Sequence, residues 1–343
     1  MADDASNDTP TLRGKRAWLI TDGKAGMMTH VRGLADALGV VAENRIVDPK
    51  GAYKFFSPYG PAPKAEMFGP EGLFKPPFPA IAIASGRLAI PYLRALKKAA
   101  GHRVFTVYMQ DPRTGAKTAD MIWVPAHDRL RGTNVIVTLT SPHGFSAARI
   151  SELRKSVPAD IAALPQPRVT VVLGGKNKVY RFSEAADRRF AASLAALAKA
   201  GCSFMITPSR RTHPELLRLV DEATRGAPRI LWDGTGENPY PQFLAQADAL
   251  VVTADSVNMC GEACATGRPV YVFTPDGGSK KFSRFHAALR EYGAVRELPE
   301  TIGALETWDY APLDAASVVA REVESRWAKR ALMLGGCDGG AEC

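Results

Sequence analysis

Apolar runs of strand length alternate with segments of helical periodicity along the chain. Runs of four to six apolar residues bounded by polar or glycine-containing turns are typical of strands that a parallel sheet buries on both faces. In the first half they predict strands at residues 17–21, 44–47, 80–84, 104–108, 121–124 and 134–138, with helices at 27–38 and 88–99. This alternation favours an α/β fold with a parallel sheet.

The second half repeats the alternation after a proline-rich stretch at residues 157–167, where we place an interdomain linker. Strands are predicted at 168–173, 203–206, 230–232, 249–252 and 270–273, and helices at 183–200, 214–223, 242–247, 257–265, 284–291 and 315–332. The pattern predicts two Rossmann-like domains, at residues 15–165 and 166–311, followed by a terminal helix at 312–334. We expect a disordered N-terminus at 1–14 and a flexible tail at 335–343.

Residues 50–79 interrupt the alternation. The segment is rich in proline, glycine and aromatic residues and has no helical period. We interpret it as a long surface loop, and loops of this length are usually functional or contact a partner. Two interpretations of its aromatic side chains stay open: they contact membrane lipid, or they fasten the loop to its own domain.

Composition and charge narrow the class of protein. The 343 residues are 46% hydrophobic with a mean hydropathy of −0.12, and no apolar run is long enough to span a bilayer. The first ten residues lack the apolar core of a secretory signal, so we expect a cytoplasmic protein that can bind peripherally at the inner membrane. A net charge of +9 favours anionic partners such as nucleotide diphosphates and acidic lipids. Nucleic acid is disfavoured, because no long Lys/Arg block is present.

The cysteines indicate neither a disulfide framework nor a metal site. There are five of them, at positions 202, 260, 264, 337 and 343, an odd and scattered set. Cys260 and Cys264 lie one helical turn apart, but no further Cys or His is near them in the sequence. We therefore predict no metal site.

Polar loops follow several predicted strands of the first half, at the edge where open α/β sheets bind ligands. The first strand ends in Asp22-Gly23-Lys24-Ala25-Gly26, whose glycines let backbone N–H groups approach a ligand. Asp22, Asp111 and His143 are the candidate acids or bases. Lys24 can neutralise a diphosphate or an acidic acceptor, and a tight turn with a surface lysine is the structural alternative.

The second half presents comparable loops. Candidate anion-binding residues follow two of its strands: Gly174, Gly175 and Lys176 after the first, and Ser209, Arg210 and Arg211 after the second. Asp255 or Ser256 can cap the helix that follows the strand at 249–252, and a capped helix N-terminus suits an anion. Glu262, two turns into that helix, can accept hydrogen bonds from ribose hydroxyls. An ordinary βαβ crossover with a capped helix is the structural alternative.

Taken together, these motifs resemble the elongated-mitochondria fission-factor family, which includes a plant mitochondrial-fission protein and many alphaproteobacterial members. The motifs are Asp22–Gly26, Gln110–Arg113, Ser141–His143, Leu173–Gly175, Thr207–Thr212 and Asp255–Val270, in this order between about residues 15 and 330. The resemblance implies a GT-B-like fold, akin to the glycosyltransferase that adds N-acetylglucosamine to the lipid-linked peptidoglycan precursor. It implies a C-terminal helix that packs back on the first domain.

By the same analogy, Ser256, Met259 and Glu262 would line a donor site, with Gly174 and Gly175 near the diphosphate. We expect a metal-independent glycosyltransferase that moves a sugar from a nucleoside-diphosphate sugar to an envelope or lipid-linked acceptor. The first loop departs from that enzyme, because His30 comes four residues after Gly26, which leaves the identity of the base open.

Two alternatives remain. One is a non-catalytic interaction protein at a membrane or division site. The other is a hydrolysing nucleotide-sugar epimerase, which would need carboxylates facing the sugar. Only Asp255 and Glu262 are obvious candidates for those carboxylates.

Overall fold

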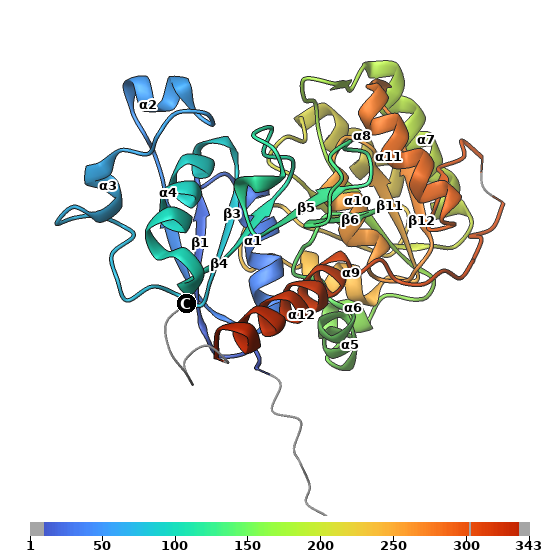
Figure 1. Ribbon diagram of the computed structural model, residues 1–343. Coiled ribbons are helices and arrows are strands. Elements are labelled where there is room, and N and C mark those ends of the chain that lie inside the picture. Colours follow the sequence, from blue (N-terminus) through green and yellow to red (C-terminus); the bar gives the residue numbers. More distant parts are fainter. Residues whose placement is uncertain (1–9, 302, 336–343) are drawn as a thin grey trace, which may run out of the picture. The chain divides into compact units, whose positions relative to one another are not determined.

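The structure, a computed structural model, describes residues 10–301 and 303–335. Within these residues the chain forms two compact units. Unit 1 comprises residues 10–138, 142–144 and 315–335, and unit 2 comprises 139–141, 145–301 and 303–314. Each unit is a parallel sheet with helices on both faces (Figure 1), as the alternating pattern predicts.

The sheet of unit 1 has six parallel strands in the order β2-β1-β3-β4-β5-β6. The strands are β1 (Arg16–Thr21), β2 (Val41–Ile46), β3 (Ile81–Ser85), β4 (Phe105–Met109), β5 (Met121–Pro125) and β6 (Val135–Thr138). Every residue of β3, β4 and β5 is buried, because helices cover both faces of the central strands. This burial explains why these strands are continuously apolar in the sequence.

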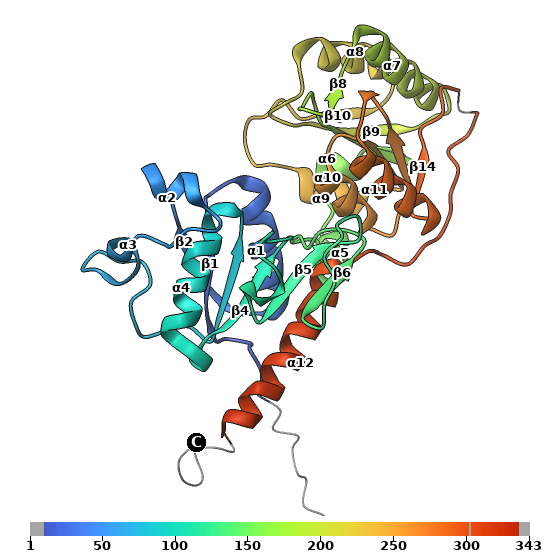
Figure 2. The same cartoon turned by 45° about the horizontal axis from the view of Figure 1, so that its top comes forward.

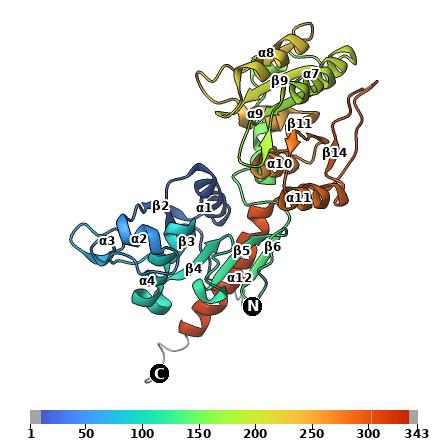
Figure 3. The ribbon, with the colours of Figure 1, turned by 90° about the horizontal axis from the view of Figure 1, so that it is seen from above.

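Two helices, α1 (Ala25–Leu38) and α12 (Ala315–Gly335), cover one face of this sheet, and α4 (Ile90–Ala100) covers the other. The terminal helix α12 lies beside α1 and along the sheet (Figure 2). The opposite face is packed by α4, with α2 (Gly51–Phe56) and α3 (Lys64–Phe68) at the outer margin of the unit (Figure 3). The terminal helix therefore packs back on the first domain, as predicted.

The sheet of unit 2 also has six parallel strands, in the order β10-β9-β7-β11-β12-β14. They are β7 (Arg168–Leu173), β9 (Ser203–Pro208), β10 (Arg229–Leu231), β11 (Ala249–Thr253), β12 (Val270–Phe273) and β14 (Val295–Glu297). One face is covered by α7 (Glu184–Lys199) and α8 (Pro214–Thr224), and the other by α5 (Ala147–Lys155), α6 (Ala159–Ala162), α9 (Tyr240–Gln246), α10 (Val257–Cys264) and α11 (Lys280–Glu291). A small antiparallel pair, β8 (Tyr180–Arg181) and β13 (Asp276–Gly277), lies beside the main sheet.

The structure differs from the sequence prediction in two segments. The interpretation of 50–79 as a helix-free loop is wrong: α2 and α3 lie there, and helices of six and five residues are too short to show a period. The proline-rich stretch at 157–167 contains α6 and belongs to unit 2, and the chain passes between units at 138–145 rather than at 165. Pro158 precedes the first turn of α6, a position where proline is compatible with a helix start.

Some predicted features fall outside what the structure describes or remain untested by it. The predicted disordered N-terminus lies largely outside the described residues, as does all but the first residue of the predicted tail. Cys337 and Cys343 are also outside them. In the described ranges, no helix combines the length and the apolar character that a membrane span requires.

Candidate functional site

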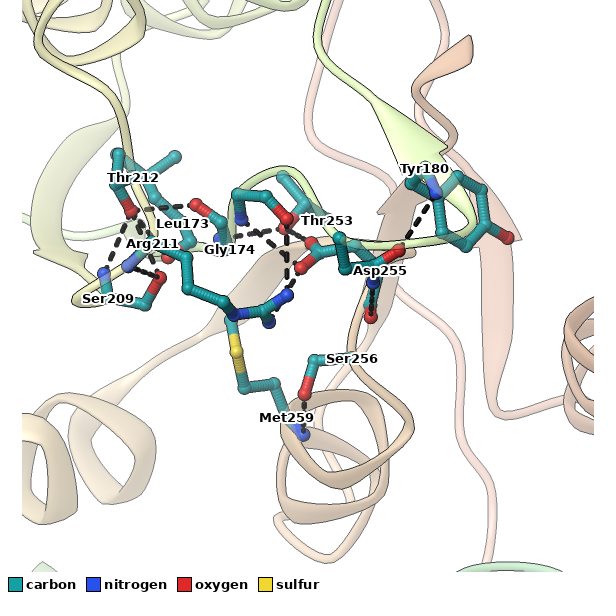
Figure 4. A network of polar contacts seen from close by, with 12 residues as sticks. Leu173, Gly174, Tyr180, Ser209, Arg211, Thr212, Thr253, Asp255, Ser256 and Met259 are labelled. Carbon is teal, nitrogen blue, oxygen red and sulfur yellow. Dashed lines mark hydrogen bonds and ion pairs between the residues drawn. The ribbon is translucent and has the colours of Figure 1, made fainter. Parts of the chain in front are cut away.

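Three loops of unit 2 meet around one carboxylate at the carboxyl edge of the sheet (Figure 4). They follow β7, β9 and β11, which are adjacent in the sheet, so their ends come together. The loops supply Gly174 and Gly175, then Ser209, Arg211 and Thr212, and finally Asp255. The sequence analysis singled out five of these six residues as a ligand site.

Asp255 is the centre of this cluster, and its side chain is fully buried. Its Oδ2 accepts hydrogen bonds from the amide of Gly175 at 3.1 Å and from Arg211 Nη2 at 2.8 Å. Its Oδ1 accepts the hydroxyl proton of Thr253 at 2.6 Å, and the Thr253 oxygen accepts from the amide of Gly174 at 2.8 Å. A buried carboxylate is tolerated only when donors and an opposite charge surround it in this way.

The glycine pair is required by the close approach of these loops. A Cβ at position 174 would lie 2.0 Å from Asp255 Oδ1, and one at position 175 would lie 1.9 Å from the carbonyl oxygen of Arg211. Both distances are far inside van der Waals contact. Both glycine amides also donate to protein atoms in this structure. The Gly-Gly sequence is therefore explained by packing, and the predicted contact of these amides with a diphosphate remains a prediction.

A second set of hydrogen bonds fixes the loop after β9. The Thr212 hydroxyl contacts the carbonyl oxygens of Leu173 and Gly174 at 3.0 and 2.7 Å, and it accepts from the Ser209 amide at 2.9 Å. The Ser209 hydroxyl accepts from the amide of Arg211 at 3.2 Å. Lys176 and Arg210 are exposed beside these loops, and neither forms an ion pair within the described residues. Their cationic ends are accessible to an anionic ligand.

The helix α10 begins directly after Asp255. Ser256, one of the two caps that the sequence predicts, is its N-cap, and the Ser256 hydroxyl accepts from the amide of Met259 at 3.3 Å. Glu262 lies further along the helix and is partly buried, and the hydroxyl of Tyr240 donates to its Oε2 at 2.6 Å. Burial raises the pKa of Glu262 to about 7, while the Tyr240 hydrogen bond lowers it. The Tyr240 hydroxyl already donates to one carboxylate oxygen of Glu262, and the other oxygen can accept a hydrogen bond from a ligand hydroxyl.

Sequence reasoning missed several residues of this region. Thr253 and Thr212 fall within the motifs, but nothing in the sequence distinguishes a network hydroxyl from an ordinary loop threonine. The Asn177 side chain donates to the carbonyl oxygen of Asp255 at 3.0 Å and accepts from two amides of its own loop, at 2.7 and 2.8 Å. Tyr240 lies 22 positions from Glu262 in the sequence, so only the fold reveals the pair.

Asp22 and Asp111 lie at the carboxyl edge of the sheet of unit 1. Asp22 follows β1, its side chain is 8% exposed, and it forms an ion pair with Lys24. Gly23 has a φ of 77°, which favours glycine, and Gly26 lies in the first turn of α1. A Cβ on Gly86, at the end of β3, would lie 3.6 Å from Asp22 Oδ1, so the ends of β1 and β3 are close together.

The charges of both aspartates act on Tyr108, the penultimate residue of β4. Burial raises the pKa of its hydroxyl, and the negative charges of Asp111 and Asp22 raise it further, whereas a hydrogen bond with the Gly86 backbone lowers it. Both carboxylates therefore act electrostatically on one phenol. The structure brings Asp22 and Asp111 into one neighbourhood, as predicted from the strand ends.

The Asp111 loop also has an unusual backbone. Gln110 has a φ of 113° and Arg113 a φ of 59°, and both are non-glycine residues in a region that favours glycine. Asp111 Oδ1 accepts from the amide of Arg113 at 2.8 Å, which helps to hold this conformation. Such strain costs on the order of 1–3 kcal/mol per residue and clusters at functional sites. The backbone thus marks this loop as a functional candidate independently of its carboxylate.

His143, the third predicted catalytic residue, is only 2% exposed. Its backbone packs against Gly33 of α1, where a Cβ would approach His143 Cα to 2.7 Å. An acid or base that acts on a bound substrate must reach it, and this ring is shielded by protein. His143 therefore fits that role less well than the two aspartates. Among the described residues, no group of three or more His, Cys, Asp and Glu is arranged to hold a metal ion.

The fold of the chain matches solved structures. The glycosyltransferase SnogD from Streptomyces nogalater superimposes with a TM-score of 0.50 at 16% identity, over 95% of this chain and all of SnogD. The UDP-GlcNAc 2-epimerase from Methanocaldococcus jannaschii also gives a TM-score of 0.50, at 8% identity, over 90% of this chain and 99% of the enzyme. At such low identity these likenesses concern the fold alone, and they confirm the predicted GT-B architecture.

Sequence comparison identifies relatives. The family model described as "Mitochondrial fission ELM1" matches residues 25–327. The chain is 31% identical over 281 residues to the mitochondrial fission protein ELM1 of Arabidopsis thaliana, and 34% identical over 186 residues to the uncharacterized protein RP120 of Rickettsia prowazekii. The matches cover 74% and 52% of this chain, and they span 66% and 51% of the two relatives. The chain therefore belongs to the mitochondrial fission ELM1 family, as its motifs predict.

Proposed function

We propose that this protein binds a nucleoside-diphosphate sugar in unit 2 and transfers the sugar, without a metal ion, to an envelope or lipid-linked acceptor bound at the loops of unit 1. One observation carries the proposal: the Ser256-capped start of α10 and the partly buried Glu262 lie next to three loops that converge at the carboxyl edge of the sheet. Ligands of open α/β sheets bind at this edge.

The chemistry of unit 2 suits such a donor. The N-terminal end of α10 favours a diphosphate, because its first amides lack helical partners and the helix dipole is positive there. Lys176 and Arg210 are exposed cations beside it. Glu262 would accept a hydrogen bond from a ribose hydroxyl, sharing its carboxylate with Tyr240. Asp255 is too deeply buried to contact the ligand, and its role is to hold Arg211 and the glycine loop in position.

The transfer itself requires a base. Asp22 or Asp111 would take the proton of the acceptor hydroxyl while the oxygen attacks the anomeric carbon of the sugar. The bond between that carbon and the diphosphate breaks, and the nucleoside diphosphate leaves with the electron pair. Cations and helix amides stabilise its added charge. His143 would serve only if its ring became accessible.

The name of the matched glycosyltransferase supports this proposal, whereas the name of the matched UDP-GlcNAc 2-epimerase supports nucleotide-sugar binding and the epimerase alternative. The name of the Arabidopsis relative supports the alternative of an interaction protein in organelle division. An interaction protein of this fold would have no need for a strained loop around Asp111. We therefore favour the enzyme.

Calorimetric titration of the purified chain with UDP-, GDP-, dTDP- and CMP-sugars tests the donor site. We expect one nucleotide class to bind, with an affinity that falls about tenfold or more in Glu262→Gln, the loss expected when a hydrogen bond to a charged group is removed. Glu300→Gln, an exposed glutamate of the same unit, is the matched control and should bind as the wild type does. Absence of binding by every donor would contradict the proposal.

A second assay tests catalysis. Transfer or slow hydrolysis of the bound donor would be followed by release of the nucleoside diphosphate. Asp22→Asn and Asp111→Asn should retain donor binding in unit 2, and one of them should lose about 10²–10⁴-fold in rate. Full activity in both variants would exclude the two aspartates as the base.

A further inference from the structure

Unit 1 carries an exposed group of aromatic side chains on and around α2 and α3. We call Tyr53, Phe55, Phe56, Tyr59 and Phe68 the aromatic face. Phe55 and Phe56 are 79% and 60% exposed, and none of the residues of α2 is buried. Their rings contact each other edge to face, with centroids 5.1 Å apart, instead of packing into the domain. Apolar surface that a fold leaves in water in this way commonly marks an interaction site.

An apolar groove adjoins the aromatic face. It has a volume of about 960 Å³ and runs between α3 and α4. Its apolar lining includes Tyr59, Pro61, Met67, Phe68, Pro91 and Ala95. Three cationic side chains also line it, Lys64, Arg94 and Lys98. The groove therefore has an apolar floor with positive charge around it.

A smaller pocket of about 510 Å³ lies next to the groove, since Tyr59 and Arg94 line both. Arg113 and Lys117 add two further cations to its wall, together with Thr114 and Thr118. Within the described residues, Lys64, Lys98, Arg113 and Lys117 form no ion pair, and all four are exposed. Phosphate is the anion that such a pocket of guanidinium and ammonium donors suits best.

The charge of the whole chain is concentrated in this region. Residues 50–118 contain eleven Lys and Arg but only three Asp and Glu, a net charge of +8, whereas the complete chain has a net charge of +9. The rest of the molecule is therefore almost neutral. The segment that leaves its aromatic side chains in water is also the segment that accounts for nearly all of the net positive charge.

We infer that this region of unit 1 docks on a membrane containing anionic phospholipid. Aromatic side chains enter the headgroup region, acyl chains occupy the groove, and lipid phosphates bind Arg94, Arg113 and Lys117. The exposed aromatic side chains match the apolar part of such a membrane, and the clustered cations, which form no ion pair within the described residues, match its anionic headgroups. Arg113 lies two residues from Asp111, so the membrane would be close to the candidate base. The inference goes beyond the nucleotide site and does not depend on it.

Vesicle co-sedimentation of the full chain tests the inference, in the absence of nucleotide, so that its outcome is separable from that of the donor site. The probes are phosphatidylcholine vesicles with and without about one-third phosphatidylglycerol, the anionic component. We expect the wild type to bind anionic vesicles at least about tenfold more tightly than neutral ones, and less tightly as salt is raised. Equal binding to both, or to neither, would overturn the inference, and the face would then be assigned to a protein partner.

Two double variants separate the contributions. F55A/F56A removes apolar contact, and R113Q/K117Q removes charge; each should weaken binding to anionic vesicles about tenfold. The matched controls are L332A/M333A, two exposed apolar residues of α12, and K199Q/K329Q, two exposed lysines distant from α2 and α3 in the sequence. All eight substituted residues are exposed, so folding should be retained in the four double variants. Equal losses in the test and control variants would contradict docking at this surface.

Discussion

The loops of the two sheets hold their carboxylates in opposite ways. In unit 2, Asp255 is fully buried, every bond around it is made within the protein, and the glycines beside it leave no free space. In unit 1, the Asp22 side chain keeps 8% of its surface exposed and pairs with the exposed Lys24, Asp111 is partly buried, and the loop around Asp111 is strained at Gln110 and Arg113. A saturated network stabilises a structure but has no donor or acceptor left for a ligand. Asp255 therefore builds the scaffold, whereas the aspartates of unit 1 are available for chemistry.

The largest effect should come from adding one methyl group in unit 2. Gly174→Ala places a Cβ 2.0 Å from Asp255 Oδ1, which forces the loops apart and breaks the network. We expect a loss of about 3 kcal/mol in the free energy of unfolding, measured by urea denaturation. Gly23→Ala is the matched change in unit 1, where the Cβ would have a normal contact with Ile46 and only the positive φ is unfavourable. Its expected cost is about 1 kcal/mol, and equal losses would contradict the comparison.

Removing the charge of each carboxylate should give the next largest difference. Asp255→Asn removes the negative charge that pairs with Arg211, and it places an NH2 group where a carboxylate oxygen now accepts hydrogen bonds. We expect a loss of about 2 kcal/mol in the free energy of unfolding. Asp111→Asn should cost less than about 1 kcal/mol, because the carboxylate is only partly buried and accepts one amide. Urea denaturation at neutral pH measures both. A larger loss for Asp111→Asn would reverse the roles assigned to the two regions.

Glu262 gives a pH-dependent test within unit 2. Burial raises its pKa from 4.5 to about 7, so between these values the folded protein keeps a proton that the unfolded chain releases. Its contribution to stability is therefore fully present below pH 4.5 and is lost as the pH rises to about 7. Relative to Glu262→Gln, the wild type should become less stable across this window. A difference between the two proteins that stays constant from pH 4.5 to 7 would contradict the raised pKa.

The smallest effect, and the only stabilising one, is expected at the strained loop of unit 1. Gln110→Gly allows the φ of 113° without steric cost, and we expect a gain of about 1 kcal/mol in the free energy of unfolding. Thr114→Gly, in the same loop but without a positive φ, should instead lose stability because glycine is more flexible when unfolded. Thermal denaturation of the two variants distinguishes these signs. Loss of transferase activity together with the gain in stability would show that the strain serves the chemistry.

Much of the fold could be predicted because its signals are local. The buried strands β3, β4, β7 and β11 are predominantly apolar runs, and each is followed by a loop whose polar residues stand out against it. The cap of α10 was predictable for the same reason, since Ser256 directly precedes its helix. Elements without a strong local pattern were missed or misplaced. The helices α2 and α6 are too short to show a period, and α5 buries only Ile150.

Most residues of the candidate site could be predicted from the sequence, but their burial and hydrogen-bond partners could not. Strand ends located Gly174, Arg211 and Asp255 at one edge, and the structure brings them together. The sequence could not show that the Gly174 amide bonds to Thr253, or that Tyr240 reaches Glu262 across 22 positions. It also suggested His143 as an acid or base, whereas the structure encloses it against α1. Burial and side-chain partners depend on which elements pack together, and that information is distributed over the whole chain.

The sequence by itself therefore determined the α/β class, the order of strands and helices along the chain, and the family. It also determined which strands are followed by polar loops at their carboxyl ends. These properties follow from hydrophobic periodicity and from residues close in sequence. Only the tertiary structure decided which carboxylate is sealed in a network, which loop is strained, and which aromatic residues stay in water. Each of these depends on contacts between distant segments, because burial is a property of the packed chain and not of a residue type.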